Sequence, residues 1–338
     1  MKVLFIGGTG VISSAVSELA LKKGFDLYLL NRGNNSEFFP AGAKAIIADI
    51  RNEQNVESLI KNTRFDVVVD WIAYQPEHVK TDIRLFKGRT DQYIFISSAA
   101  CYKRPVNHYY IDESTPLYNP YWQYAQDKIA CEELLMKEFR ENSFPVTIVR
   151  PSLTYGVTSI PHILNSRKSR WTLIDRMRRG KKIIVPGDGT SLWTITHNTD
   201  FAKGFVGLIG NVQAVGHAFH ITSDEVLNWN QITDVIGKAA GVKPDIIHIP
   251  SDFISAFAPD LKGNLLGDKS ESVVFNNSKI KRFVPDFVAT VPFSEGIKQS
   301  VEYYESKPEL CQVDEEFDEL MDRIISAYET GLKLANKN

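Results

Sequence analysis

Short, uninterrupted runs of apolar residues recur through the first 150 residues of this 338-residue chain, separated by polar or helical segments. Strands that are buried on both faces, as in parallel sheets, have this appearance. Segments of helical pattern, such as residues 12–23 and 121–140, alternate with the runs and indicate βαβ units. The pattern therefore predicts an α/β fold with a doubly wound parallel sheet. The predicted strands are residues 3–6, 27–30, 45–48, 66–69, 93–96 and 146–149.

The composition is that of an ordinary globular protein. With 43% hydrophobic residues, 24% charged residues and a net charge of −2, the chain as a whole offers no strongly basic surface for nucleic acid or a membrane. Its three cysteines are widely spaced, which argues against a disulfide framework and a zinc site. No apolar run approaches the ~18 residues of a membrane span. Because residues 1–6 enter a strand rather than a signal peptide, we expect a cytoplasmic protein. We expect no metal site.

A glycine-rich turn, GGTGVIS at residues 7–13, links the first predicted strand to the first predicted helix. Glycine lets the backbone approach a pyrophosphate, and the helix N-terminus offers free N–H groups and a positive dipole end. Ser13 takes the third small position, which allows a helix to pack closely on a strand. An ordinary glycine turn is the alternative. The residues predicted to bind a dinucleotide here are Gly7, Thr9, Gly10, Val11, Ile12 and Ser13.

The residues that end the second and third predicted strands bear on the choice of dinucleotide. Asn31 and Arg32 stand where an acidic residue would bind the adenosine ribose of NAD. Because that carboxylate is missing and a guanidinium is available for a 2′-phosphate, the sequence favours NADP over NAD. Asp49 and Ile50, after the third strand, are predicted to flank the adenine. A solvated turn residue at Arg32 and a structural cap at Asp49 are equally good interpretations.

Three further residues suggest a catalytic centre. Tyr124 and Lys128 lie four residues apart on one face of a predicted helix. A nearby positive charge lowers the pKa of a tyrosine from its usual value of about 10, so we expect Tyr124 to exchange a proton with a substrate hydroxyl near neutral pH. Ser98 follows the fifth strand at its C-terminal end, where open α/β sheets bind ligands, and is expected to hold the reacting oxygen. Each feature alone is common on protein surfaces, and their combination carries the prediction.

In these motifs the sequence resembles the extended short-chain dehydrogenase/reductase superfamily, and within it the NAD(P)-dependent epimerase/dehydratase family. The matching stretches include FIGGTGVIS, FISSAACY, YAQDKIACEE, VRPSLTYG and FHITSDEVLNW, and the resemblance covers about residues 2–290. It implies a Rossmann-type sheet with a smaller, mostly C-terminal substrate lobe. The NAD(P)-binding domain would comprise residues 1–155 and 195–225. The substrate-binding lobe, with a terminal helix, would comprise residues 156–194 and 226–338.

The resemblance also assigns roles by position. Lys128 would hold the nicotinamide ribose as well as serve in catalysis, Pro151 and Ser152 would lie near the nicotinamide, and Ala73 would contribute to the cofactor site. The implied mechanism has a tyrosine exchanging the hydroxyl proton while the nicotinamide carries the hydride. The implied catalytic triad is Ser98, Tyr124 and Lys128.

Two departures from the family pattern narrow the substrate. Ala99 and Ala100 replace the acidic pair that follows the catalytic residue of sugar-nucleotide dehydratases, which argues against dehydratase chemistry. Trp193, four residues before His197, replaces an arginine that clamps the diphosphate in sugar-nucleotide epimerases. For Trp193 a packing role is favoured over stacking on a substrate. His197 and Asp200 are expected to be structural.

A basic stretch in the second lobe leaves further options open. Its charge suits an anionic substrate or the cofactor phosphate, but a solvated helix face is the favoured interpretation for most of its members. A looser resemblance to the plastid stem-loop RNA-binding branch of the superfamily adds RNA as a third option. The residues are Arg167, Lys168, Arg170, Arg176, Arg178, Arg179, Lys181 and Lys182.

Two functions follow from these observations. The favoured one is an NAD(P)-dependent epimerase or reductase that acts by Tyr- and Lys-assisted hydride transfer on a sugar, a sugar-nucleotide or another small hydroxyl or keto substrate. The alternative is a non-catalytic protein that uses the same fold to sense NAD(P) or bind RNA. The intact set of Ser98, Tyr124 and Lys128 argues against that alternative, because a sensor needs no proton-transfer pair. A homodimer through two exposed helices is expected by resemblance, and nucleic acid is not expected as a partner.

Overall fold

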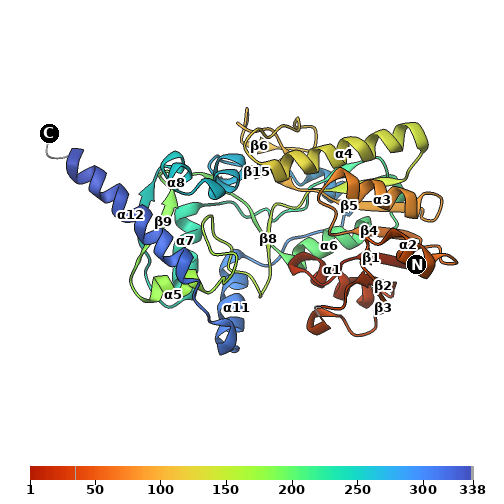
Figure 1. The fold of residues 1–338 in the computed structure, drawn as a ribbon, viewed down its shortest axis with the longest axis horizontal. Helices are drawn as coiled ribbons and strands as arrows, with labels where there is room; N and C mark the ends of the chain where they lie inside the picture. Colours follow the sequence, from red (N-terminus) through yellow and green to blue (C-terminus); the bar gives the residue numbers. More distant parts are fainter. Residues whose placement is uncertain (35, 336–338) are drawn as a thin grey trace.

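The computed structural model describes residues 1–34 and 36–335. A parallel seven-stranded sheet forms the centre of the half that is predicted to bind the cofactor, the cofactor half (Figure 1). Its strand order is β12-β7-β5-β4-β1-β2-β3, and the order reverses between β1 and β4 as in doubly wound folds. The predicted Rossmann-type sheet is therefore confirmed. Its strands are β1 (Lys2–Ile6), β2 (Asp26–Asn31), β3 (Lys44–Ile47), β4 (Val67–Asp70), β5 (Gln92–Ile96), β7 (Val146–Val149) and β12 (Ala218–Phe219).

Helices cover both faces of the sheet, which explains why its strands are apolar throughout. Successive side chains alternate between the faces, so Leu4 and Phe5 enter different cores. One face is covered by α1 (Val11–Lys22), α6 (Asn198–Leu208) and α10 (Ser278–Phe283), the last of which lies in the part of the chain that we assigned to the substrate lobe. The other face is covered by α2 (Glu53–Ile60), α3 (Pro76–Phe86) and α4 (Gln123–Asn142) (Figure 1).

The second lobe has its own apolar core. Trp193 is 1% exposed and stacks on Trp229 with ring centroids 5.8 Å apart, so the packing role expected for it is confirmed. A parallel strand pair, β9 (Lys182–Pro186) with β14 (Asp245–Ile249), was not predicted. The main helices are α5 (Thr172–Arg178), α7 (Trp229–Ala239), α11 (Phe293–Glu305) and α12 (Glu315–Ala335).

Shorter elements connect the two halves. The single turn α9 continues directly into a π-helical turn, Leu265–Lys269, which lies over the start of α4. The short elements are β6 (Tyr110–Ile111), β8 (Leu153–Tyr155), β10 (Leu192–Trp193), β11 (Ile195–His197), β13 (Leu227–Asn228), β15 (Val274–Phe275), α8 (Ser251–Phe257) and α9 (Lys262–Asn264).

Among the residues that the structure describes, no helix has the length and apolarity needed to span a membrane, and no cluster of His, Cys, Asp and Glu is suited to a metal ion.

Candidate active site

The glycine turn after β1 has a conformation that side chains would disrupt. Gly7 and Gly8 have φ values of 97° and 100°, which few other residues adopt. A Cβ on Gly8 would also lie 2.7 Å from Leu29 Cδ2. The turn leads into α1, and the first N–H groups of that helix, including those of Val11 and Ile12, have no carbonyl of the helix to bind. These groups and the helix dipole make the turn a suitable anion site.

Ser13 fits the third small position of the turn. Its side chain is 3% exposed, and its Oγ accepts a hydrogen bond from the Gly10 N–H at 2.8 Å. Two more side chains hold the turn in place. Ser17 Oγ donates to the Gly8 carbonyl at 3.0 Å, and Asn198 Nδ2, from α6, donates to the Val11 carbonyl at 2.7 Å. The departure from glycine is therefore accommodated, although it occupies the Gly10 N–H.

A cavity of about 480 Å³ runs from the glycine turn to α4. It brings together most of the residues predicted from the sequence. Trp71, Ile72 and Tyr74, which follow β4, also line it and were missed, because no motif marks them. The predicted residues that line this cavity are Gly7, Thr9, Gly10, Val11, Ile12, Ser13, Ser98, Tyr124, Lys128, Pro151 and Ser152.

Five predicted cofactor residues lie outside the cavity lining. Two of them form turns: each accepts the backbone N–H of the residue two positions later, at 2.8 Å for Asn31 Oδ1 and 2.9 Å for Asp49 Oδ1. Ile50 and Ala73 bury their side chains in the apolar core. Any contact of these two with a cofactor would have to use the backbone. The fifth residue, Arg32, is exposed on the turn after β2.

Tyr124 lies in the first turn of α4, Ser98 lies two residues after the end of β5, and both line the same cavity. Burial raises the pKa of Tyr124 above its ordinary value, and hydrogen bonding with Ser98 acts in the opposite direction. The expectation that Lys128 lowers the pKa of this phenol is therefore wrong for the structure as described. Tyr124 is a protonated phenol near neutral pH, and thus a proton donor at rest.

Lys128 explains this outcome. Its side chain is 1% exposed, and Nζ donates to the carbonyl oxygens of Ala73 and Ile96, each at 2.6 Å. Nζ lies 6.0 Å from the ring centroid of Tyr124, so the ammonium is held by the two carbonyls rather than by the phenol. Burial lowers the pKa of Lys128 to about 8. An ammonium has three donors, and these bonds use two of them.

A second cavity, of about 370 Å³, meets the first at the candidate catalytic residues. Ser98, Tyr124, Pro151 and Ser152 line both. Ser152 Oγ is buried and has no hydrogen-bond partner among the described residues. Tyr124 therefore stands between a groove that contains the glycine turn and a pocket that faces the second lobe.

The second lobe closes this pocket with its π-helical turn. Gly263 and Gly267 allow a close approach to Trp122, since a Cβ on either would lie 2.4 or 2.9 Å from that side chain. Asp268 and Lys269 line the pocket and are paired at 2.6 Å. The sequence interpretation missed both residues, although the two glycines spaced four apart were an available signal.

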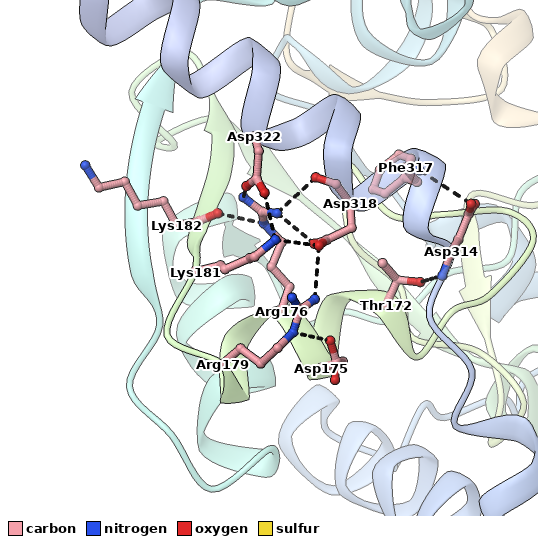
Figure 2. Close-up of polar contacts among 10 residues, drawn as sticks. All are labelled: Thr172, Asp175, Arg176, Arg179, Lys181, Lys182, Asp314, Phe317, Asp318 and Asp322. Carbon is pink, nitrogen blue, oxygen red and sulfur yellow. Dashed lines mark hydrogen bonds and ion pairs between the residues drawn. The ribbon is translucent and has the colours of Figure 1, made fainter.

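The basic stretch of the second lobe is mostly neutralised by α12. Arg176 Nη1 contacts Asp318 Oδ1 at 2.7 Å, and Lys181 Nζ contacts Asp318 and Asp322 at 2.6 and 2.7 Å (Figure 2). Asp318 is 2% exposed; burial raises its pKa, but hydrogen bonds from the basic side chains outweigh this and lower it to about 2. The expectation of a solvated helix face is therefore wrong for Arg176, which is buried, whereas Lys168, Arg178 and Arg179 are exposed as well as paired. The other pairs are Arg179 with Asp175 and Asp318, Arg178 with Glu305, Lys168 with Glu316, and Lys182 with Glu329.

His197 and Asp200 have the structural roles expected of them. His197 Nδ1 bonds to Thr199 Oγ1 at 2.7 Å at the start of α6. Asp200 is fully buried, pairs with Lys203 at 2.6 Å and accepts the Val291 N–H at 2.8 Å. His197 therefore caps α6 and Asp200 joins α6 to the segment around Val291, and neither residue lines a cavity at Tyr124.

Comparison with known proteins agrees with this architecture. The chain belongs to the NAD dependent epimerase/dehydratase family, whose sequence profile matches residues 3–222, and the expected family is confirmed. A UDP-glucose 4-epimerase of Lactobacillus helveticus is 25% identical over 83% of this chain and 90% of its own. The chloroplast stem-loop binding protein of 41 kDa b from Arabidopsis thaliana is 25% identical over 75% of this chain and 67% of its own. The UDP-glucose 4-epimerase of Bifidobacterium longum, solved with NAD⁺ and UDP, has the same fold, with 19% identity, a TM-score of 0.71 and coverage of 91% and 99%. Members of this family are enzymes.

Proposed function

We propose that this protein is an NAD-dependent epimerase or reductase that acts on a hydroxyl or keto group of a sugar-like substrate, with Tyr124 as the proton-transfer group. One observation supports this above the others: Tyr124 and Ser98 lie where the glycine-turn groove meets the second pocket. A dinucleotide in the first and a substrate in the second would meet at the phenol. Relatives of this chain include UDP-glucose 4-epimerases, which act on a nucleotide-sugar.

The residues of the groove fit a nicotinamide dinucleotide. The glycine turn is a cradle that a Cβ would fill, and the free N–H groups of α1 suit a pyrophosphate. At the other end, the third N–H of Lys128 is available for a ribose hydroxyl, and Ser152 Oγ is buried without a partner among the described residues. When bound, a nicotinamide would supply the site that accepts and returns a hydride.

The protein's own groups account for the proton. Ser98 would position the reacting substrate oxygen, and Tyr124 would give a proton to it during carbonyl reduction or take one during alcohol oxidation. Because burial raises the pKa of Tyr124, the phenol is ready to donate near neutral pH, whereas the accepting phenolate is scarce. Alcohol oxidation should therefore speed up as pH rises, while carbonyl reduction should not. Lys128 is a positioning residue for the ribose in this scheme.

The choice between NADP and NAD is part of this proposal. NADP is favoured over NAD only by the missing acid and by the exposed Arg32 after β2, while the solved relative holds NAD⁺. The RNA-binding alternative loses the support of most of the basic stretch, because six of its eight residues are paired within the protein. A cytoplasmic location and a homodimer stay predictions.

The test compares Tyr124→Phe with Tyr121→Phe, an exposed neighbour that lines neither cavity. Calorimetry should show that both variants bind NAD⁺ as the wild type does. In a screen of free and phosphorylated sugars for NAD⁺ reduction, Tyr124→Phe should lower turnover by about 10²- to 10⁴-fold, the range of general acid–base catalysis. Tyr121→Phe should be unaffected. Absence of dinucleotide binding, or full activity of Tyr124→Phe, would contradict the proposal.

A further inference from the structure

Two members of the basic stretch differ from the rest. The ion pairs with α11, α12 and Asp175 account for six of its residues. Arg167 and Arg170 form no ion pair with a carboxylate in residues 1–34 and 36–335. The same chain thus neutralises six neighbouring cations and leaves two uncompensated.

Arg170 holds its charge in a costly environment. Its side chain is half-buried, and Nη1 donates to the Ser166 carbonyl at 2.9 Å. Burial lowers the pKa of Arg170; Tyr304 acts in the opposite direction, and the positive charge of Arg167 lowers the pKa further. A partly buried charge without a counter-ion is unfavourable unless a ligand supplies one.

Both arginines line a third cavity, of about 790 Å³. Arg167 and Lys269 also line the pocket beside Tyr124, so the two spaces adjoin. One molecule that fills both would contact Tyr124 at one end and Arg170 at the other.

The other charged groups of this cavity are largely engaged. Lys168 is paired with Glu316, and Lys269 with Asp268. Of the two lining carboxylates, Asp314 accepts a hydrogen bond from Ser166 Oγ at 2.6 Å and Asp260 is exposed. His162 is neutral, because burial lowers its pKa to about 4. The free positive charge of the cavity therefore resides on Arg167 and Arg170.

We propose that Arg167 and Arg170 bind an oxyanionic group of the substrate, a phosphate or a carboxylate, while its reacting hydroxyl lies against Tyr124. A guanidinium pairs with two oxygens of such a group at once, and two guanidiniums surround it. The inference rests on the proposed function. It adds that the substrate is an anionic sugar derivative and names the residues that select it.

The test uses protein saturated with NAD⁺, so that the glycine turn does not bind the probe. Inorganic phosphate and acetate are titrated separately and followed by the midpoint of thermal unfolding. Wild type should show saturable stabilisation by one of the two anions, which identifies the group. Arg167→Gln and Arg170→Gln should each weaken that binding by about tenfold or more, the loss of one charge-assisted interaction. Lys168→Gln, which removes an already paired cation of the same stretch, is the matched control and should bind as the wild type does.

Several outcomes would overturn the inference. These are wild type that responds to neither anion, or equal binding by all three variants and the wild type. Arg170→Lys, which keeps the charge but not the planar fork, should lie between wild type and Arg170→Gln. If Arg170→Gln fails to fold, the exposed Arg167 decides the question. NAD⁺ binding is measured separately, so its failure defeats the proposed function, whereas NAD⁺ binding without an anion response defeats only this inference.

Discussion

The two halves of the molecule place polar groups by different means. In the cofactor half, the groove is built from backbone N–H groups of one turn, held by hydroxyls of Ser13 and Ser17 only a few residues away. In the second lobe, side-chain charges dominate, and the partners lie far apart in the chain, as with Arg176 and Asp318. The glycine turn is thus held mainly by local contacts, with one long-range bond from Asn198, whereas the second lobe depends on long-range pairing throughout.

The largest effect is expected from a substitution that breaks the charge cluster of the second lobe, in which Asp318 pairs with Arg176, Arg179 and Lys181. Asp318→Asn removes the carboxylate that Arg176 contacts. Both side chains are nearly inaccessible to solvent, with 2% of Asp318 and 4% of Arg176 exposed. Breaking a buried pair costs about 3–5 kcal/mol when it leaves an uncompensated charge. Because Asp322 still contacts Arg176 Nη2 at 2.6 Å, we expect a loss at the lower end of this range, about 3 kcal/mol. Urea unfolding should show a loss of this order. Calorimetry should find NAD⁺ affinity unchanged, since the groove lies in the other half.

The control is Glu316→Gln, whose pair with Lys168 is exposed and should contribute only about 0–1 kcal/mol. Equal losses of stability in the two variants would mean that burial does not govern the cluster. Weakened NAD⁺ binding in Asp318→Asn would show that the two halves are energetically coupled.

A smaller effect is expected from the glycine turn. Gly8→Ala forces a side chain into a φ of 100° and against Leu29, at a cost of about 1–3 kcal/mol for the backbone strain alone. NAD⁺ affinity should also fall, because the turn must shift. Gly24→Ala is the matched control: its φ is also positive, at 79°, but a Cβ there meets nothing within 4 Å. That variant should lose stability and keep its affinity for NAD⁺; equal affinities in both variants would argue that the turn does not bind the dinucleotide.

The smallest effect concerns the choice of cofactor. Arg32→Ala should weaken NADPH binding by less than about tenfold, because an exposed ion pair is worth at most about 1 kcal/mol, and should leave NADH binding unchanged. Fluorescence titration with both reduced cofactors measures this difference. If both affinities fall equally, or neither falls, the sequence-based preference for NADP is wrong.

The sequence allowed the cofactor half to be predicted in some detail, for physical reasons. Buried parallel strands leave apolar runs, and the glycine turn needs residues without a Cβ, so both are visible locally. By contrast, β9 begins at Lys182, directly after Lys181, and these two charged residues concealed the apolar strand pattern. Asp318 meets Arg176, and Asp268 reaches the pocket beside Tyr124, only after the chain has folded. The direction of the Tyr124 pKa shift was missed because it depends on burial and on the carbonyls that hold Lys128.

The path of the chain between the halves has a practical consequence. After the second lobe begins, α6, β12 and α10 each return to the cofactor sheet, and α10 contributes Ile280 to the core beneath it. A truncation near residue 155 would remove α6 and α10, leave α1 alone on that face of the sheet and uncover part of its apolar core. No single cut yields two self-sufficient pieces, so dissection of this protein requires internal replacement rather than shortening.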